Sequence, residues 1–213
     1  RRGHVSVLYK NKLFIYSGYN DDQQIFLNDL HYFNFSTNTW HEIKLNRGEF
    51  PKYGTWGSSA ALYDRYMIIY GGNNGNYYRS TTYAFDLEDL HWIKLNCEGD
   101  IPPERYCQVC AIYRNMFFCH AGYNGNDAFL SDFYYLDLSD LSHPTWHEIN
   151  AKDPPSKRAD HSGVIWRDYF FIFGGYNGDV CNNDLYCYDI LYGTWTLLTP
   201  KTIEVPHIRA YTS

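Results

Sequence analysis

The sequence predicts an all-β protein assembled from four copies of one unit of about fifty residues. An apolar run ends at a small residue and a glycine four times, in the phrases LFIYSGYND, MIIYGGNNG, FFCHAGYNG and FIFGGYNGD. The glycines of this column are Gly18, Gly72, Gly122 and Gly175. A tryptophan follows each phrase, at Trp40, Trp92, Trp146 and Trp195. Two columns that keep register over the whole chain indicate a single structural unit repeated in series.

Each unit contains four short apolar pieces that we interpret as strands. In the fourth unit they are Ser162 to Trp166, Tyr169 to Phe173, Asp184 to Ile190 and Trp195 to Leu198. The pieces are rich in β-branched and aromatic residues and are too short for helices. Turn residues such as Arg-Asp, Gly-Gly, Asn-Gly and Tyr-Gly separate them. The unit is therefore expected to be an antiparallel meander of four strands.

Every strand of the unit has its own boundary signal. The first ends at an aromatic residue nine positions before the glycine column: Tyr9, Tyr63, Tyr113 and Trp166. The second ends at the glycine pair, because glycine tolerates a positive φ and allows a sharp bend. An Asn/Asp column lies six residues before the tryptophan, or nine in the third unit: Asn34, Asp86, Asp137 and Asp189. The tryptophan opens the fourth strand, and in the third unit the segment 139–144 lengthens the turn before it.

A single meander of this size cannot bury both of its faces, so the units must cover one another. Twisted sheets arranged around a common axis do so, and this architecture is a β-propeller with one blade per unit. The tryptophans offer large apolar faces to fill the seams between adjacent sheets, which pack roughly 10 Å apart. We expect a β-propeller or a partial propeller made of four-stranded antiparallel blades.

The repeat resembles the kelch family, in which a double glycine is followed by Tyr or Asn, then by a Trp about twenty residues on, and then by Gly/Pro-x-x-Arg. The resemblance covers residues 1–213 as one kelch-repeat domain, with blades at about 1–46, 51–96, 102–150 and 155–199. The tail 209–213 resembles the start of a further repeat. The resemblance implies a kelch-type propeller. Because kelch propellers mostly have five to seven blades, we expect this chain to be a fragment of a larger one.

The units depart from the kelch pattern at three places. The first glycine of the pair is replaced by Ser17 in the first unit and by Ala121 in the third, which should be structurally mild. Thr55 stands in the second unit where the others have arginine, with Lys52 as an alternative displaced by three residues. The missing arginine should alter the site.

An unclosed array of blades would expose the outer faces of its end blades, which predicts self-association or low solubility.

Composition and charge exclude several classes of function. The net charge is -6 and there is no Lys/Arg-rich run, which argues against nucleic acid as a partner. The longest apolar runs are about five residues, too short to cross a membrane. The six cysteines lie mostly inside predicted strands, so buried free thiols in a reducing, cytoplasmic compartment fit better than a disulfide framework.

Motifs that resemble catalytic or metal sites are better explained by the repeat. Cys107 and Cys110 have the spacing of a zinc or redox pair, but no matching second pair exists, and on a strand their sulfurs would face opposite sides. His41-Glu42 and His147-Glu148 lack the second histidine of a zinc-protease helix and occupy equivalent positions after the tryptophan. We therefore predict no catalytic residue, no metal site and no cofactor.

The polar residues that flank the glycine column form the candidate site. Arginines precede the first strand of three units, and three residues later come His4, Gln108 and His161, with Ser58 in the second unit. The resemblance to kelch propellers implies that this turn, with the residues after the double glycine, lines one mouth of the central channel. The predicted partner-binding residues are Arg1, His4, Tyr19, Asn20, Asn73, Asn74, Arg105, Gln108, Tyr123, Asn124, Arg158, His161, Tyr176 and Asn177.

These residue types suit a protein or peptide partner. Arginine offers planar bidentate donors and tyrosine offers rigid amphipathic area, so a segment carrying Asp or Glu would fit. Four nearby acids oppose this preference: Asp21, Asp22, Asp127 and Asp179. The structural alternative is that each arginine bonds loop carbonyls to hold a neighbouring blade and that the asparagines only form turns. Both interpretations stay open for the arginines and tyrosines.

The sequence favours a non-catalytic scaffold that binds a segment of another protein at the mouth of the propeller. The alternative is an enzyme on the same fold, a copper oxidase or a metal-assisted lyase, because fold alone does not fix function. His4 and His161 are the phased histidines available to such a site. A third possibility is assembly, in which open blade edges pair with other copies of the chain.

Overall fold

The structure is a computed structural model in which residues 1–44, 48–126, 128–202 and 206 are described. Within these ranges the secondary structure consists of β-strands joined by turns, with no helix. The all-β prediction is confirmed, and the strands form four antiparallel meanders that match the four predicted units. Among the described residues there is no helix that could cross a membrane.

Each blade has its strands in sequence order from the inside outward. The first blade contains β1 (Val5–Tyr9), β2 (Lys12–Tyr16), β5 (Leu30–Asn34) and β6 (Thr39–Ile43), with a side hairpin of β3 (Tyr19–Asn20) and β4 (Ile25–Phe26). The second contains β7 (Ser59–Tyr63), β8 (Tyr66–Tyr70), β9 (Tyr83–Asp86) and β10 (His91–Lys94).

The third and fourth blades repeat this arrangement. The third contains β12 (Val109–Tyr113), β13 (Met116–Tyr123), β14 (Phe129–Asp137) and β15 (Thr145–Glu148). The fourth contains β16 (Ser162–Trp166), β17 (Tyr169–Phe173), β18 (Leu185–Asp189) and β19 (Thr194–Leu198). The strands of the fourth blade agree with the predicted pieces to within a residue at each end.

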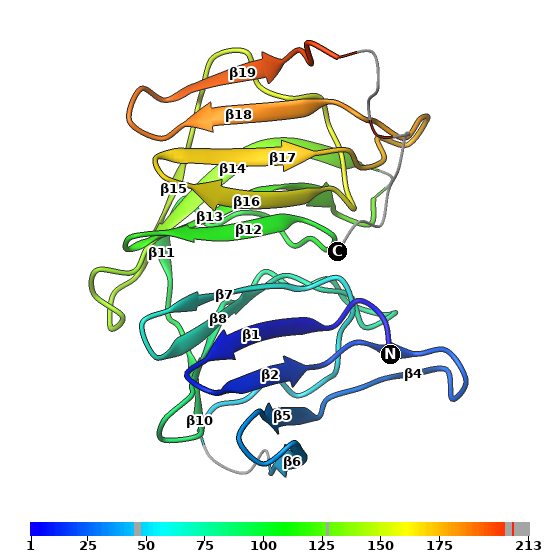
Figure 1. Cartoon of the computed structure of the whole chain (residues 1–213), viewed down its shortest axis with the longest axis vertical. Helices are drawn as coiled ribbons and strands as arrows, with labels where there is room; N and C mark the ends of the chain where they lie inside the picture. The colour runs from blue at the N-terminus through cyan, green and yellow to red at the C-terminus, as the bar shows by residue number, and fades with distance from the viewer. Residues whose placement is uncertain (45–47, 127, 203–205, 207–213) are drawn as a thin grey trace.

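The four blades stand side by side around an open arc. The inner strands contact one another in series, β1 with β7, β7 with β12, and β12 with β16. β1 and β16, at the two ends of the series, make no comparable contact, so the described residues do not close a ring. Figure 1 shows the third and fourth blades above the first and second, with the loops that follow each second strand on the side where the N-terminus lies.

Alternation along the strands builds one apolar core at each seam. On β2, Phe14 and Tyr16 are buried toward the second blade, while Leu13 and Ile15 face the other side. A second core joins the second and third blades, and a third joins the third and fourth. Each interior sheet therefore contributes one face to each of two cores, and a sheet at either end of the arc has one face without a neighbour.

Three of the four tryptophans fill seams as expected. The rings of Trp92, Trp146 and Trp195 are buried. Each packs on a ring from the preceding blade: Trp92 on Tyr16 at 4.9 Å, Trp146 on Tyr70 at 5.1 Å, and Trp195 on His120 at 5.3 Å between ring centroids.

The expectation was wrong for Trp40, which is 55% exposed and whose one ring contact with the described residues is with Phe33 of its own blade. The physical reason is the side of the sheet toward which each indole points. Each indole packs against the blade before it, and no described strand precedes the first blade.

The linkers between blades add a contact that the sequence did not predict. Each linker runs parallel to the outermost strand of the blade it leads into. β11 (Glu98–Gly99) pairs with Thr145 and Trp146, and single bridges join Gly48 to Trp92 and Lys152 to Thr194. These contacts cover edges that would otherwise present unpaired backbone groups.

All six cysteines are free, with Cys107, Cys119 and Cys187 buried, in agreement with the expected free thiols. The predicted further repeat at 209–213 lies outside the described residues.

Candidate partner-binding mouth

The glycine column holds successive blades together at the end where each second strand finishes, and we call this end of the molecule the mouth. The N–H of Gly72 donates to the carbonyl oxygen of Arg105 in the next blade at 2.8 Å. Gly18 bonds in the same way to Thr55, and Gly122 to Arg158, each at 2.8 Å. The glycines adopt positive φ values between 93° and 107°. The turn that carries the arginine is therefore anchored by the blade before it.

A second set of backbone bonds links successive blades two residues after the arginine column. The N–H of Gly57 donates to Gly3 at 3.0 Å, that of Cys107 to Gly57 at 2.7 Å, and that of Asp160 to Cys107 at 3.0 Å. All four residues have positive φ. This belt fixes the spacing of the blades at the rim, so the loops above it are carried on a rigid frame.

Arg105 and Arg158 lie inside this frame rather than on its surface. Both side chains are fully buried. Arg105 donates to the Ala121 carbonyl at 2.9 Å and to both oxygens of Asp132 at 2.6 and 2.7 Å. Arg158 makes the equivalent bonds to Gly174 and Asp184. Both side chains bond a loop carbonyl, as the structural alternative proposed, but the carbonyl and the aspartate belong to the arginine's own blade and not to a neighbouring one.

The first and second blades differ from this arrangement. Arg1 pairs with Asp29 at 2.7 Å, but both side chains are partly exposed. In the second blade Thr55 replaces the arginine, and the strand register places Thr81 at the position of the aspartate. Thr55 is buried, while Lys52 is exposed, so Thr55 and not Lys52 occupies the column. The first replacement is visible from the sequence alone, whereas the second is visible only once the aspartate partner of the arginine is known.

The polar residues three positions after the arginines also lie mainly inside. Gln108 donates to the Tyr70 carbonyl at 2.8 Å, and His161 shares a hydrogen bond of 3.0 Å with His120. Both histidines are buried. Burial, reinforced by Arg158, lowers the pKa of His161 to about 3. His4, in contrast, is exposed on the first blade.

The asparagines form turns. In each case the side-chain oxygen accepts a backbone N–H from a residue two or three positions later. The pairs are Asn20 from Asp22 and Gln23, Asn73 from Gly75, Asn74 from Asn76 and Tyr77, Asn124 from Asn126, and Asn177 from Asp179 and Val180. These bonds use the amide oxygens within the loop. The asparagines therefore shape the loops that carry the tyrosines.

The tyrosines join a continuous band of half-buried rings across the mouth. Trp56 contacts Tyr106 at 5.2 Å, Tyr106 contacts Tyr123 at 5.5 Å, Tyr123 contacts Phe129 at 4.9 Å, and Phe129 contacts Tyr176 at 5.4 Å between ring centroids. We call these five residues the aromatic band. It spans the second, third and fourth blades. Each of its rings is partly exposed.

The first blade extends this surface through Arg2. Its guanidinium lies over the rings of Tyr19 and Trp56, at 5.5 and 5.6 Å from their centroids. Arg2 also pairs with Asp21 at 2.9 Å in an exposed ion pair. Sequence reasoning missed Trp56, Tyr106 and Arg2, although they form a column of their own, one residue after the arginine column.

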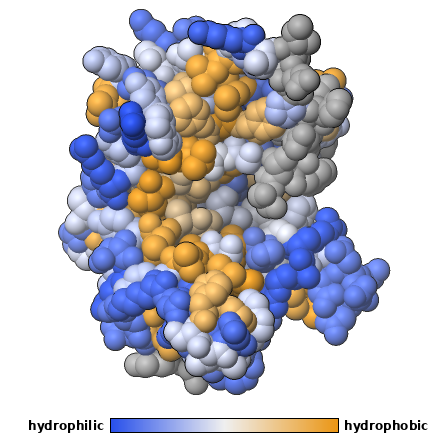
Figure 2. All heavy atoms as spheres, in the orientation of Figure 1, coloured by the Kyte–Doolittle hydropathy of each residue, from blue (hydrophilic) through white to orange (hydrophobic). Residues whose placement is uncertain are grey.

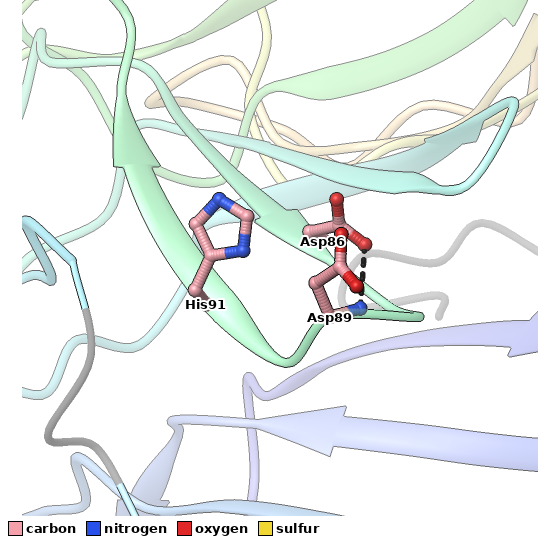
Figure 3. Close-up of side chains that lie close together, drawn as sticks. All are labelled: Asp86, Asp89 and His91. Atoms are coloured by element: carbon pink, nitrogen blue, oxygen red, sulfur yellow. Dashed lines mark hydrogen bonds between the residues drawn. The ribbon is translucent and has the colours of Figure 1, made fainter.

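A cluster of possible metal ligands lies at the other end of the second blade. Asp86, Asp89 and His91 come together at the turn between β9 and β10, as Figure 3 shows, with their ligand atoms within 4.8 Å of one another. Arg65 already pairs with Asp86 at 2.6 Å and with Asp89 at 3.0 Å. Asp86 also accepts the N–H groups of Glu88 and Asp89. This carboxylate holds the turn, as expected for its column, and an arginine neutralises it.

The fold and the mouth define a class: a partial β-propeller whose blades are joined by glycine turns and whose loops carry an aromatic surface. Comparison with known proteins agrees. The family described as the KLHDC2/KLHL20/DRC7 Kelch-repeats domain matches residues 1–122 and again residues 108–213. The chain belongs to the kelch-repeat family, as the sequence indicated.

Several curated proteins are similar to this chain. Kelch domain-containing protein 2 of Bos taurus is 28% identical over 234 residues, covering 95% of this chain and 57% of the relative. Kelch domain-containing protein 3 of Homo sapiens is 26% identical, covering 98% of this chain and 59% of the relative. Leucine-zipper-like transcriptional regulator 1 of Homo sapiens is 28% identical over 183 residues, 21% of its length. The chain thus spans little more than half of the first two relatives.

Proposed function

We propose that this chain is a non-catalytic interaction scaffold that binds a segment of another protein at its mouth. The observation that carries the proposal is the aromatic band, whose rings stay partly exposed on a frame fixed by backbone hydrogen bonds. Aromatic side chains are enriched at binding hot spots because they bury large rigid area at a small entropic cost. The rigid frame reduces the cost of ordering the site on binding.

The structure changes which predicted residues can contact a partner. Arg105, Arg158, Gln108 and His161 are buried and use their donors inside the protein, so they support the mouth from below. Tyr19, Tyr123 and Tyr176 remain candidates for direct contact, together with the exposed His4 and Arg1. The asparagines contribute through the loops they shape. The partner surface proposed here is therefore more aromatic and less cationic than the sequence indicated.

A preference for acidic segments remains part of the proposal. Arg2 supplies a positive charge at the rim, although Asp21 pairs with it. Titration of an acidic peptide and of its charge-reversed counterpart against the protein measures the preference directly. Tighter binding of the acidic peptide supports it, whereas equal or absent binding overturns it. We also propose a cytoplasmic location, since all six thiols are free.

A peptide library displayed on phage tests the binding function without knowledge of the partner. Binders selected on the protein should lose affinity for the Tyr106→Ser and Tyr176→Ser variants, each of which removes one ring of the aromatic band. Tyr192→Ser is the matched control, because Tyr192 is 82% exposed at the opposite end of the fourth blade. Binders that depend on Tyr192 but not on the band would overturn the proposal. Thermal unfolding confirms that each variant folds.

The enzyme alternative has no specific support at the mouth. His161 is bonded to His120 in the interior, whereas His4 is exposed in the first blade, so the two phased histidines do not converge on an open site. A metal analysis of the purified protein addresses this alternative. Stoichiometric copper or iron would favour the enzyme over the scaffold.

A second proposal concerns the two outer faces of the arc. Figure 2 shows hydrophobic side chains gathered along the middle of the face in view. Exposed apolar residues lie on the first blade, at Leu8 and Trp40, and on the fourth, at Val164 and Trp166. Beside Trp40 there is a pocket of about 440 Å³, also lined by Ile15 and His31. At every internal seam a ring from the preceding blade occupies the equivalent place.

The fourth blade carries such a ring, because Phe173 stands at the position of Tyr16, Tyr70 and His120. We therefore propose that the fourth blade of a second copy docks on the first blade, with Phe173 against Trp40. Light scattering over a range of concentrations tests this self-association. Oligomers that become monomers in Trp40→Glu support it. A monomer at all concentrations, or oligomers unaffected by Trp40→Glu, would overturn it.

A further inference from the structure

The second blade has lost both members of the buried ion pair found in the third and fourth. Arg105 with Asp132 and Arg158 with Asp184 correspond to Thr55 and Thr81. Loss of only one partner would leave an unpaired charge in the interior, which is costly. The double replacement avoids that cost and leaves the second blade with neither a column arginine nor a column carboxylate.

Another guanidinium takes up similar surroundings in the second blade. Arg79, from the loop between β8 and β9, lies 5.6 Å from the ring centroid of Tyr83. Arg105 lies 5.6 Å from Tyr134, and Arg158 lies 5.5 Å from Tyr186.

Arg79 and Arg105 also act in the same way on a buried tyrosine of the preceding blade. Burial raises the pKa of Tyr16, with Arg79 opposing the rise. Burial likewise raises the pKa of Tyr70, and there Arg105 opposes it. Arg79 thus brings a positive charge to the second blade by a different route along the chain.

Unlike the column arginines, Arg79 has no carboxylate partner among the described residues. Its Nη2 donates to the Tyr53 carbonyl at 3.0 Å. Its Nη1 is buried and has no hydrogen-bond partner within the described part of the chain. The aspartate that satisfies a guanidinium at this place in the third blade is Thr81 here. A buried donor without an acceptor costs free energy that a ligand can recover by accepting its proton.

A pocket lies directly beside this arginine. It has a volume of about 380 Å³, and its lining includes Arg79, Thr55, Thr81 and the rings of Tyr53 and Tyr77. Tyr53 and Tyr77 are 59% and 68% exposed, so they offer flat contact area to a bound chain. The pocket therefore combines one guanidinium, which forms no ion pair with the described residues, with apolar area and hydroxyl groups.

We propose that this pocket of the second blade binds an acidic side chain, Asp or Glu, of a peptide partner, with Arg79 as its charge partner and Tyr53 and Tyr77 contacting the flanking residues. The proposal rests on the mouth as a peptide-binding surface and places the acidic preference at one arginine. Within the part of the chain that the structure describes, the guanidinium of Arg79 is held by one hydrogen bond, from Nη2 to the Tyr53 carbonyl. A small rotation of the side chain therefore lets both terminal nitrogens donate to a carboxylate in the pocket. A lone cation matches one carboxylate better than a phosphate, which is usually met by clusters of arginines.

Nuclear magnetic resonance with defined peptides tests the assignment. The probe is acetyl-Gly-Gly-Glu-Gly-Gly-amide, whose only charge is the glutamate side chain. We expect it to shift the side-chain resonance of Arg79 and the backbone amides of Tyr77 and Tyr78, while the same peptide with Gln in place of Glu shifts neither. A third peptide, acetyl-Gly-Gly-Gly-Gly with a free C-terminus, distinguishes a terminal carboxylate from a side-chain one. Shifts at Arg79 from this peptide alone would overturn the assignment.

Matched variants separate a binding role from a structural one. Arg79→Gln should weaken binding of the Glu peptide roughly 10- to 100-fold, the loss expected for one charge-assisted hydrogen bond. Arg114→Gln removes the same charge from an exposed guanidinium at the turn between β12 and β13 and should leave the affinity unchanged. Equal losses in the two variants, or none in Arg79→Gln, would overturn the proposal.

Rebuilding the missing pair gives an independent readout. The double variant Thr55→Arg with Thr81→Asp recreates the pair of the third blade, fills part of the pocket and supplies an internal carboxylate. It should fold with unchanged or higher thermal stability and lose the Glu-dependent shifts. A folded variant that keeps full affinity would contradict the proposal. Peptides that shift the aromatic band but never Arg79 would leave the scaffold function in place and refute this site alone.

Discussion

The N–H of Gly72 donates a hydrogen bond of 2.8 Å to the carbonyl oxygen of Arg105, across the seam between the second and third blades. The same bond recurs at the other two seams. The glycine therefore turns its own strand and also holds the loop of the next blade at the mouth. Both roles require a backbone without a side chain at this point.

Replacement of Gly72 by alanine should destabilise the protein by about 2–3 kcal/mol. The residue has φ +107°, and an added Cβ would lie 2.1 Å from Ser58 Oγ. Gly193→Ala is the control, because Gly193 has φ +70° but its Cβ would meet nothing closer than Tyr188 Oη at 3.8 Å. We expect Gly193→Ala to lower the free energy of unfolding by about 1 kcal/mol, from backbone strain alone. Urea unfolding measures both, and equal losses would argue against the close approach at Gly72.

The buried and exposed tryptophans should differ sharply in their contribution to stability. Trp146→Ala empties a seam in which the indole is fully buried, and should cost about 3–5 kcal/mol. Trp40→Ala removes an indole that is 55% exposed and should cost less than about 1 kcal/mol. The measurement is denaturant unfolding at a low protein concentration, at which self-association does not contribute. A large loss for Trp40→Ala would show that another surface covers it.

The periodic features of the fold could be predicted from the sequence, because each blade repeats the same physical requirements. The glycine column, the strand ends and the aspartates of the outer turns all recur in phase, and each has a local cause in backbone geometry. The exposure of Trp40 could not be predicted from its column, because burial depends on the neighbouring blade and not on the unit itself. The same holds for the parallel contacts of the linkers, which involve residues without a strong strand signal.

The candidate site was predicted less well, because residue type does not reveal which way a side chain points. Arg105 and Arg158 carry the chemistry of a binding site but face an aspartate 27 and 26 residues later, respectively, in the same blade. Alignment of the Asp132 and Asp184 column with the arginines shows that the second blade lacks both, which is the sequence signal for an internal pair. The aromatic band gives a weaker signal, because Trp56 and Tyr106 directly follow the arginine column.

The buried ion pair gives a prediction with an internal control. Asp132→Asn should destabilise the protein by about 3 kcal/mol, because it leaves the fully buried Arg105 without its counter-charge. Asp29→Asn breaks the corresponding pair with Arg1, where both side chains are partly exposed, and should cost about 1 kcal/mol or less. Thermal unfolding at equal salt compares the two. The reverse order would mean that Arg105 is not held mainly by its aspartate.

The pair of His120 and His161 should make the protein less stable in mild acid. Burial lowers the pKa of both, and that of His161 to about 3, from an ordinary value of 6.5. The unfolded chain therefore takes up protons below pH 6.5 that the folded protein refuses, so stability is complete above that pH and falls as the pH drops. At pH 5 the loss should be about 2 kcal/mol from His161, with His120 acting in the same direction.

The double variant His120→Tyr with His161→Gln is the control for this effect. It gives the third seam the residues that Tyr70 and Gln108 provide at the second, where Gln108 donates to the Tyr70 carbonyl. The variant should fold and should lose most of the difference in unfolding free energy between pH 7 and pH 5. A pH dependence equal to that of the wild type would assign it to the carboxylates instead.

Hydrogen–deuterium exchange with a peptide selected from the displayed library is the most direct test of binding at the mouth, because it locates the bound segment without assuming a contact residue. We expect the peptide to protect the segments around Tyr19, Trp56, Tyr106, Tyr123 and Tyr176, which meet at the mouth. The turns at the opposite end, around Arg65, Arg114 and Tyr192, should exchange as in the free protein. Protection confined to those opposite turns would contradict peptide binding at the mouth.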